Sequence, residues 1–255
     1  QDGDGRPDRS ILADPFALGF FLLDQLVRDG ELTVKQRNEL LVEMTDDVAQ
    51  LVLDDNRAQT LALMIARTQS LSMVNVHARY LDTLEAEGYL DRHLEFLPTD
   101  KQIAERQAAG SGLRAPEFAV MIAYTKNADV VEVLDSDLPD DPALESELMA
   151  YFPRSVRERF PDAIRSHRLR REIVATSIVN NMVNLAGISF DHRMTEDSGA
   201  SVSDVARGFI ASRDIFGFAD VWREIDDLGS SISLDTQISL FLDARRRIVD
   251  RVGGT

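Results

Sequence analysis

The chain has 255 residues, of which 44 are acidic and 28 are basic, so its net charge at pH 7 is −16. This charge excludes nucleic acid as a partner, because such binding requires a basic surface, and it disfavours an anionic membrane surface for the same reason. The absence of cysteine excludes disulfides, thiolate zinc sites and cysteine nucleophiles. No apolar run reaches the roughly 18 residues of a transmembrane helix. We therefore expect a folded, cytoplasmic protein with no membrane partner.

Apolar residues recur at steps of three and four along almost the whole chain, as at Leu41, Met44, Val48 and Leu51. This spacing places them on one face of a helix, whereas the alternation typical of strands is almost absent. The pattern predicts helices near residues 14–29, 33–55, 57–70, 72–87, 99–109, 115–135, 142–152, 161–187, 202–214, 217–228 and 232–252.

Residues that begin and end helices stand at the borders of these segments. Side-chain oxygens that can accept from the free N–H groups of a first turn are expected at Thr33, Thr45, Thr99 and Ser201. Helix stops are expected at Gly30, Gly88, Gly187 and Gly229. We therefore expect an all-α fold, a multi-helix domain without a sheet. Since dinucleotides are usually bound at the ends of parallel strands, this fold predicts no such site.

Two short motifs resemble ligand-binding loops. Residues 110–115 have the spacing of a dinucleotide fingerprint, but they follow a polar, helix-forming segment instead of a buried strand. We interpret them as a helix stop followed by a new helix at Pro116. Residues 2–5 resemble the start of a calcium loop but lack its further ligands, so we interpret them as a solvated terminal segment.

The histidines and lysines give no clear site. His77, His93, His167 and His192 are far apart, and no two have the spacing of a helical zinc site. We expect them at the surface or at helix ends, and we expect no metal ion. Lys126 ends an apolar run and could lie partly buried. We favour the commoner arrangement, in which a lysine lies near a helix C-terminus.

Seven arginines lie between residues 154 and 171, against two carboxylates, in an otherwise acidic chain. Guanidinium groups bind carboxylates and phosphates with paired hydrogen bonds, so this segment could form an anion site. We favour ion pairs with neighbouring helices, because the chain has many carboxylates to offer. For Arg245, Arg246 and Arg247 we favour a structural role over anion binding more strongly, because the helix dipole stabilises cations near a helix C-terminus.

Six co-linear blocks of sequence carry a resemblance to a known family. They are LTVKQRNELLVEMTDDVAQLVLDDN from Leu32, LEFLP from Leu94, GLRAPEFAV from Gly112, SDLPDDP from Ser136, HRLRREIVAT from His167 and DVAR from Asp204. In this order and spacing they resemble the C-terminal region of the large NAD-specific glutamate dehydrogenases of bacteria. The resemblance runs from about Leu22 to Arg247, which is nearly the whole chain.

The resemblance implies oxidative deamination of L-glutamate to 2-oxoglutarate and ammonium, with NAD as hydride acceptor, in a cytoplasmic homo-oligomer. In such enzymes the substrate lysines, the catalytic aspartate and the glycine-rich nucleotide turn lie upstream. We therefore assign no catalytic, cofactor-binding or metal-binding residue here and expect NAD to bind to the upstream catalytic core. Residues 1–21 depart from the family pattern, and Arg57 stands where an aromatic residue is expected. The expected division is an unmatched segment, residues 1–21, and a helical C-terminal domain, residues 22–255, of a longer polypeptide.

The expected role is support of the catalytic core and the oligomer, and we expect the chain alone to be inactive. Arg168, Arg170 and Arg171 are the candidate interface with the core, as a cluster of salt bridges. One alternative is a regulatory module in which the arginine cluster binds an acidic metabolite. Two others are a free-standing helical adaptor and a domain that is catalytic by itself.

Overall fold

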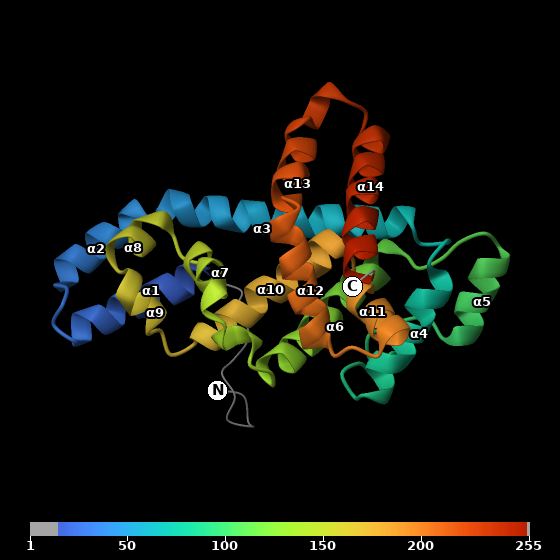
Figure 1. The fold of residues 1–255 in the computed structure, drawn as a ribbon, viewed down its shortest axis with the longest axis horizontal. Coiled ribbons are helices and arrows are strands. Elements are labelled where there is room, and N and C mark those ends of the chain that lie inside the picture. Colours follow the sequence, from blue (N-terminus) through green and yellow to red (C-terminus); the bar gives the residue numbers. More distant parts are fainter. Residues whose placement is uncertain (1–14, 254–255) are drawn as a thin grey trace. The chain divides into compact units, whose positions relative to one another are not determined.

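A computed structural model describes residues 15–253 of the chain (Figure 1). Fourteen α-helices make up most of this part, and no strand occurs among the described residues. The all-α fold predicted from the apolar spacing is therefore confirmed. The segment that resembles the start of a calcium loop, residues 2–5, lies outside the described residues.

Most of the helices are short, and short segments connect them. The helices are α1 Pro15–Arg28, α2 Val34–Glu43, α3 Thr45–Thr68, α4 Val74–Ala86, α5 Asp100–Ala108, α6 Ala115–Leu134, α7 Glu145–Ala150, α8 Arg154–Arg159, α9 Pro161–Arg165, α10 Arg170–Ala186, α11 Phe190–Ser198, α12 Val202–Ile215, α13 Phe218–Asp227 and α14 Leu234–Gly253. The 3-10 turns are η2 Leu138–Asp140, η3 Pro142–Leu144 and η4 Gly229–Ser231.

The chain folds into two compact units. Unit 1 contains the described residues up to Ala58 and residues 137–177, and unit 2 contains residues 59–136 and the described residues from 178 onward. Helices α3 and α10 each supply residues to both units. The expected division of the chain at residue 21 stays a prediction.

In unit 1, α1 packs on α2, α2 on α8, and both α7 and α8 on α9. The core between them contains Leu23, Phe152 and Ile164, whose side chains are fully buried. Each such side chain stabilises the fold by about 1.5–3 kcal/mol. Gly19 of α1 lies close to the Met44 side chain, and a Cβ there would be 3.0 Å from the Met44 Cε.

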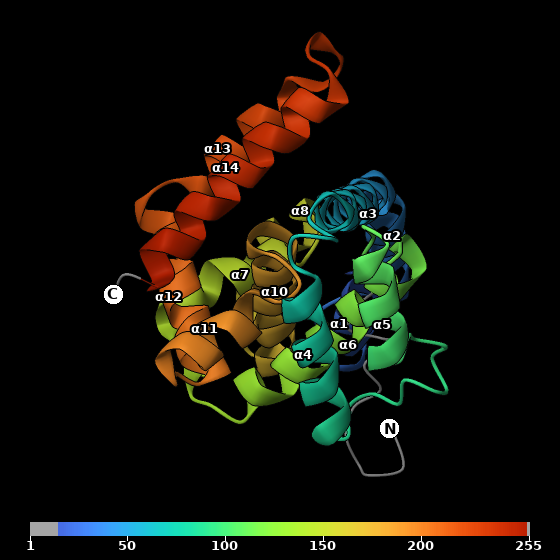
Figure 2. The same ribbon diagram turned by 90° about the vertical axis from the view of Figure 1, so that its right-hand side faces the viewer.

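In unit 2, α12 contacts α6, α11, α13 and α14 and is the best-packed helix of the unit. Phe190 and Phe209 are fully buried, and their rings meet edge to face at 6.3 Å. Helices α13 and α14 lie side by side in both views (Figure 1, Figure 2). Trp222 and Phe241 join them, with ring centroids 4.6 Å apart.

Most of the predicted signals for helix starts are confirmed. The hydroxyls of Thr33, Thr99 and Ser201 each accept a hydrogen bond from the N–H of the third residue that follows, at 3.2–3.3 Å. The prediction for Thr45 is wrong, because its hydroxyl instead donates to the carbonyl of Leu41 at 3.0 Å. A threonine inside a continuous run of helical turns often bonds back in this way.

Residues 110–115 form the predicted helix stop and helix start. Gly110 follows α5 with φ at +77°, a conformation that glycine adopts easily, and Pro116 lies in the first turn of α6. A Cβ on Gly112 would lie 2.1 Å from the carbonyl oxygen of Ser70, so only glycine fits there. The glycines thus serve packing and chain direction.

Several helix boundaries differ from the prediction. Helix α3 runs through residue 56, where the spacing predicts a break, because no glycine or proline interrupts it there. The predicted helix at 161–187 is divided into α9 and α10, and between them the His167 Nδ1 accepts from the N–H of Leu169 at 3.1 Å. Helices α8 and α11 were not predicted, since six and nine residues hold few apolar repeats.

None of the described helices alone has the length and hydropathy of a membrane span. A bent pair formed by α10 and α11 reaches that threshold only when the two helices are counted together.

Candidate functional site

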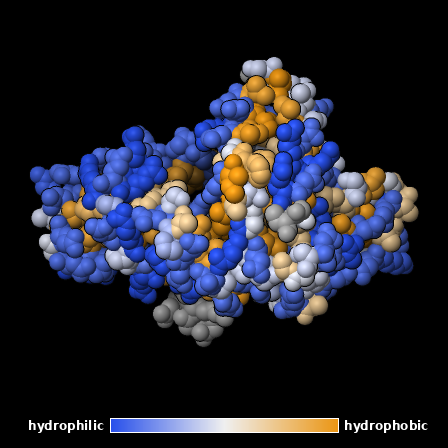
Figure 3. Space-filling view, in the orientation of Figure 1, coloured by the Kyte–Doolittle hydropathy of each residue, from blue (hydrophilic) through white to orange (hydrophobic). Residues whose placement is uncertain are grey.

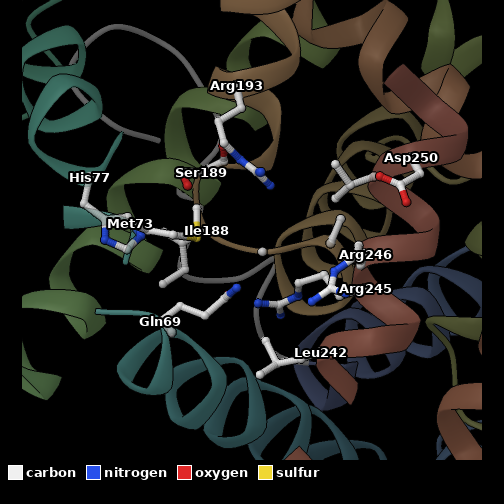
Figure 4. A pocket seen from close by; sticks show the side chains of 14 residues that line it. Gln69, Met73, His77, Ile188, Ser189, Arg193, Leu242, Arg245, Arg246 and Asp250 are labelled. Atoms are coloured by element: carbon white, nitrogen blue, oxygen red, sulfur yellow. The ribbon is translucent and has the colours of Figure 1, made fainter. Parts of the chain in front are cut away.

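A cavity of about 290 Å³ lies within unit 2 (Figure 4). Its wall comes from the end of α3, the start of α4, the turn that leads from α10 into α11, and α14. Its main polar side chains are those of Gln69, His77, Arg193, Arg245, Arg246 and Asp250. Arginines therefore outnumber carboxylates in the lining, although the chain as a whole is strongly acidic.

Arg245 is buried at the back of this cavity and is held by the end of another helix. Its Nε donates to the carbonyl of Leu185 at 3.0 Å, and its Nη2 donates to the carbonyl of Asn184 at 3.2 Å. The last carbonyls of a helix lack partners within the helix and form its negative end, so the guanidinium satisfies the C-terminus of α10. Burial lowers the pKa of Arg245 to about 9, with Arg193 as a second cause, which leaves it charged at pH 7.

Gly187 makes room for the Arg245 guanidinium. It has φ at +113°, and a Cβ on it would lie 3.2 Å from the Arg245 Nη1. On α14, Arg245 follows the buried Phe241 by four residues and precedes the buried Ile248 by three, so it lies on the apolar face of the helix.

Arg193 and Arg246 approach the cavity from α11 and α14. Arg193 is half-buried, its Nε donates to the carbonyl of Ser189 at 3.4 Å, and burial lowers its pKa. Arg246 is mostly exposed, and its nearest carboxylate is that of Asp243 at 3.9 Å. Figure 4 shows the guanidinium groups of Arg193 and Arg245 and the amide of Gln69 pointing toward the same space.

His77 of α4 is a neutral polar group in the cavity wall. It is 3% exposed, and its ring meets Phe118 edge to face at 5.0 Å. Burial, and secondly the positive charge of Arg193, lower the pKa of His77 to about 4, so the ring is uncharged at pH 7. Its Nδ1 has no hydrogen-bond partner in the part of the chain that the structure describes.

A pair of buried carboxyl groups lies elsewhere in unit 2, outside the cavity lining. Asp129 of α6 and Asp191 of α11 are neighbours whose interaction shifts the pKa of both groups. The Tyr80 hydroxyl donates to the Asp191 Oδ2 at 3.0 Å. Burial raises the pKa of Asp191 to about 6 and that of Asp129 well above its usual range. The raised pKa of Asp129 favours its protonated form, which can donate a hydrogen bond to Asp191.

The arginines of residues 154–171 lie in unit 1, and four of the seven form ion pairs. Arg170 and Arg171 both contact the Asp140 carboxylate, at 2.9 and 3.1 Å. Arg165 pairs with Glu145 at 2.8 Å and with Asp162 at 2.6 Å. The fourth arginine, Arg159 of α8, pairs with Glu43 of α2 at 2.7 Å. The predicted pairing with carboxylates is confirmed for these four. The proposed interface role of Arg168, Arg170 and Arg171 stays a prediction.

The sequence interpretation missed the residues of the cavity. Arg245 was assigned to a helix C-terminus, but it lies eight residues before the end of α14 and is buried. Its position on the apolar stripe was an available signal. His77 and His192 were expected at the surface or at helix ends and are buried within helices, and their local sequence carries no sign of this. Lys126 lies half-buried inside α6, not at its C-terminus.

Among the described residues, no group of three or more His, Asp or Glu side chains is arranged to hold a metal ion. His167 accepts a backbone hydrogen bond at the start of α10, which is the helix-end role expected for it. His192 stacks on Tyr80 with ring centroids 4.7 Å apart.

Comparison with known proteins identifies two families along the chain. Residues 110–253 match the family described as "Glutamate dehydrogenase, C-terminal", and residues 20–66 match "Bacterial NAD-glutamate dehydrogenase, catalytic domain". The first match covers more than half of the chain. The second covers α2 and most of α1 and α3.

Three similar proteins are each described as "NAD-specific glutamate dehydrogenase". They come from Halomonas elongata, with 40% identity over 89% of this chain, Mycobacterium tuberculosis, with 42% over 91%, and Pseudomonas aeruginosa, with 42% over 88%. In each case the chain spans only about 14% of the relative's length. The chain belongs to the glutamate dehydrogenase C-terminal family, as the resemblance to the large bacterial NAD-specific enzymes predicts.

Proposed function

We propose that this chain is a helical region of an NAD-dependent glutamate dehydrogenase that supports the catalytic core and the oligomer. The reaction, conversion of L-glutamate, NAD and water to 2-oxoglutarate, ammonium and NADH, takes place in the rest of the polypeptide, in the cytoplasm. The names of the relatives and the small share of their length that the chain covers support this proposal.

The observation that carries the supporting role is the loop between α4 and α5, which presents an aromatic side chain to solvent. Phe96 is 92% exposed, and Leu94 beside it is 69% exposed. Phe96 also has φ at +54°, and it is the one residue other than glycine with positive φ in the described part of the chain. This conformation costs a bulky residue about 1–2 kcal/mol, and backbone strain of this kind often lies at binding sites, which supports a contact that the chain alone does not supply.

The base of this loop is rigid, which suits a docking surface. Arg92 is 7% exposed and contacts the carboxylates of Asp82, Glu85 and Asp100, the last at 2.7 Å. The Tyr124 hydroxyl donates to the loop carboxylate of Glu95 at 2.7 Å. A loop that is already ordered loses little conformational entropy when it binds a partner surface.

A second apolar surface lies on the α13–α14 hairpin (Figure 3). Phe216, Val221, Leu228, Leu234 and Leu240 are each between 37% and 55% exposed. A contiguous apolar surface of this kind usually marks an interaction site. We assign it to contact with the remainder of the same polypeptide, or with a second copy in the oligomer.

We place NAD in the rest of the polypeptide and not in the cavity of unit 2. The cavity volume of about 290 Å³ is near the lower limit of the roughly 300–1,000 Å³ of pockets for drug-sized ligands, and no sheet edge adjoins the cavity among the described residues. An assay of NADH formation from glutamate tests whether the reaction takes place outside this chain. We expect turnover from the complete polypeptide and none from residues 1–255 alone, and turnover by the chain alone would refute the proposal.

The docking role is tested by Phe96→Gly in the complete enzyme. Glycine accepts the positive φ without strain, so the substitution removes the aromatic contact while the loop keeps its fold. We expect turnover and melting temperature both to fall. Val42→Ala is the matched control, because Val42 is 76% exposed on α2 in unit 1. If Phe96→Gly behaves like Val42→Ala in both measurements, the loop is not a docking surface.

The regulatory alternative, in which Arg168, Arg170 and Arg171 bind an acidic metabolite, has less support. Asp140 already neutralises two of these arginines. Calorimetric titration with carboxylate and phosphate ligands tests it, and heat that disappears in Arg170→Gln would favour this alternative over a supporting role.

A further inference from the structure

We propose that the cavity of unit 2 binds a small anion through Arg193, Arg245 and Arg246, with carboxylate or phosphate groups as its ligand chemistry. This site is separate from the arginine cluster at residues 154–171, and it goes beyond support of a catalytic core.

The first argument compares the cavity arginines with the other arginines of the chain, many of which form ion pairs with carboxylates. Acidic residues outnumber basic ones by 44 to 28, so carboxylates are plentiful. Arg92 contacts three of them, and Arg165 contacts two, at 2.6 and 2.8 Å. Several arginines of this fold therefore satisfy their charge with carboxylates.

The cavity arginines depart from that pattern. Within the described residues, neither Arg193 nor Arg245 pairs with a carboxylate at 4.0 Å or less, and both bond only to backbone carbonyls. Arg246 has only the distant contact with Asp243. Asp250 is the one carboxylate in the lining, and it forms no ion pair with these arginines in that part of the chain. The charges of Asp197 and Asp191 act on Arg193 and oppose the lowering of its pKa by burial, but neither carboxylate forms an ion pair with it at 4.0 Å or less among the described residues. An anion between the arginines would supply the direct counter-charge that these groups lack.

The second argument is the direction of the donors. Arg245 uses Nε and Nη2 to hold the end of α10, while its Nη1 lies beside Gly187 in the lining. Arg193 and Gln69 point to the same space from two other elements (Figure 4). Planar guanidinium groups that converge in this way match the paired oxygens of a carboxylate or phosphate.

His77 adds a third, independent sign of a ligand. His77 belongs to the cavity wall and is only 3% exposed, and its Nδ1 has no hydrogen-bond partner among the described residues. A buried polar atom without a partner costs about 1–3 kcal/mol, and a ligand oxygen or a water that accompanies the ligand would satisfy it.

The cavity volume limits the ligand to a small molecule. About 290 Å³ is near the lower limit of pockets for drug-sized ligands, which favours inorganic phosphate or a short dicarboxylate over a dinucleotide. Such an anion would contact segments from α3, α4, α11 and α14 at once. Because it binds only the folded arrangement, it would also raise the stability of unit 2 by mass action.

The test uses the complete polypeptide with two probes, inorganic phosphate and succinate, at constant ionic strength set with sodium chloride. Calorimetry measures binding, and the melting temperature is recorded with and without each probe. We expect binding of at least one probe, weakened at least tenfold in Arg193→Gln and less strongly in Arg246→Gln. Arg28→Gln is the matched control, because the Arg28 side chain is 61% exposed on α1 in unit 1 and lies outside the cavity lining, and its binding should equal that of the wild type.

The outcomes separate the possibilities. Binding of phosphate alone, succinate alone, or both, lost in the cavity variants, supports the site and identifies its anion. Equal affinity in Arg193→Gln and Arg28→Gln, or no heat with either probe, overturns the proposal. If Arg193→Gln fails to fold, Arg246→Gln decides, since its side chain is exposed and its loss removes no buried contact. Turnover by the Arg28→Gln enzyme shows separately that the catalytic core is intact.

Discussion

In unit 1 the Arg159 guanidinium and the Glu43 carboxylate meet at 2.7 Å, with about half of each side chain exposed to solvent. In unit 2 Arg245 is buried, and within the described residues its hydrogen bonds go to backbone carbonyls alone. The same residue type thus has two energetic roles. Water screens the exposed pair, which contributes little to stability, whereas a buried charge is costly unless every donor is satisfied.

The buried carboxyl pair extends this contrast. Asp129 and Asp191 are 2% and 4% exposed, while Asp140, the partner of two arginines in unit 1, is about half exposed. Unit 1 therefore keeps these charged pairs in contact with water, and unit 2 encloses charged and protonatable groups. The difference predicts that replacing these ionisable residues costs more stability in unit 2 than in unit 1.

Arg245→Met should have the largest effect. Methionine keeps an apolar stem of similar length but leaves the carbonyls of Asn184 and Leu185 without their donors, so we expect a loss of about 3 kcal/mol in the free energy of unfolding. Urea denaturation monitored by fluorescence measures it, because Trp222, the single tryptophan of the chain, packs near this region on Phe241. Arg159→Met is the control and should cost less than about 1 kcal/mol. Equal losses would remove the distinction between the units.

Asp129→Asn should stabilise the protein in a pH-dependent way. Burial raises the pKa of Asp129, so the folded state holds a proton that the unfolded state releases above about pH 4, and wild-type stability falls as the pH rises through the raised pKa. Asparagine needs no proton to donate to Asp191. We expect the gain in the free energy of unfolding to be largest at pH 8 and almost absent at pH 4.

Thermal unfolding at pH 4, 6 and 8 measures this difference. Asp243→Asn is the control, because its side chain is about two-thirds exposed and its replacement should change stability equally little at each pH. A stabilisation by Asp129→Asn that does not vary with pH would mean that the carboxyl pair holds no extra proton.

Arg170→Glu should have the smallest effect on stability. Its contact with Asp140 is exposed, so the loss within unit 1 should stay below about 1 kcal/mol. If Arg168, Arg170 and Arg171 form the interface with the catalytic core, the complete enzyme should nevertheless lose turnover. Unchanged turnover together with an unchanged melting temperature would exclude this interface.

Local features of the fold were predictable. The hydroxyls of Thr33, Thr99 and Ser201 and the glycine at 110 act within one turn of chain, so their neighbours in sequence decide their role. Some errors were local, as at Thr45, whose hydroxyl bonds back to Leu41, but those that concern the cavity arose where segments distant in sequence meet. His77 and His192 are buried by residues that no local pattern connects to them.

By itself, the sequence determined the helical class, most helix ends, the family and the pairing of several arginines with carboxylates, because apolar spacing, caps and charge balance act over a few residues or over the whole composition. Only the tertiary structure decided where Arg245 lies, since the carbonyls that hold it belong to a helix 60 residues earlier. The cavity has the same origin. Its arginines come from different helices, and packing alone places their charges around one space.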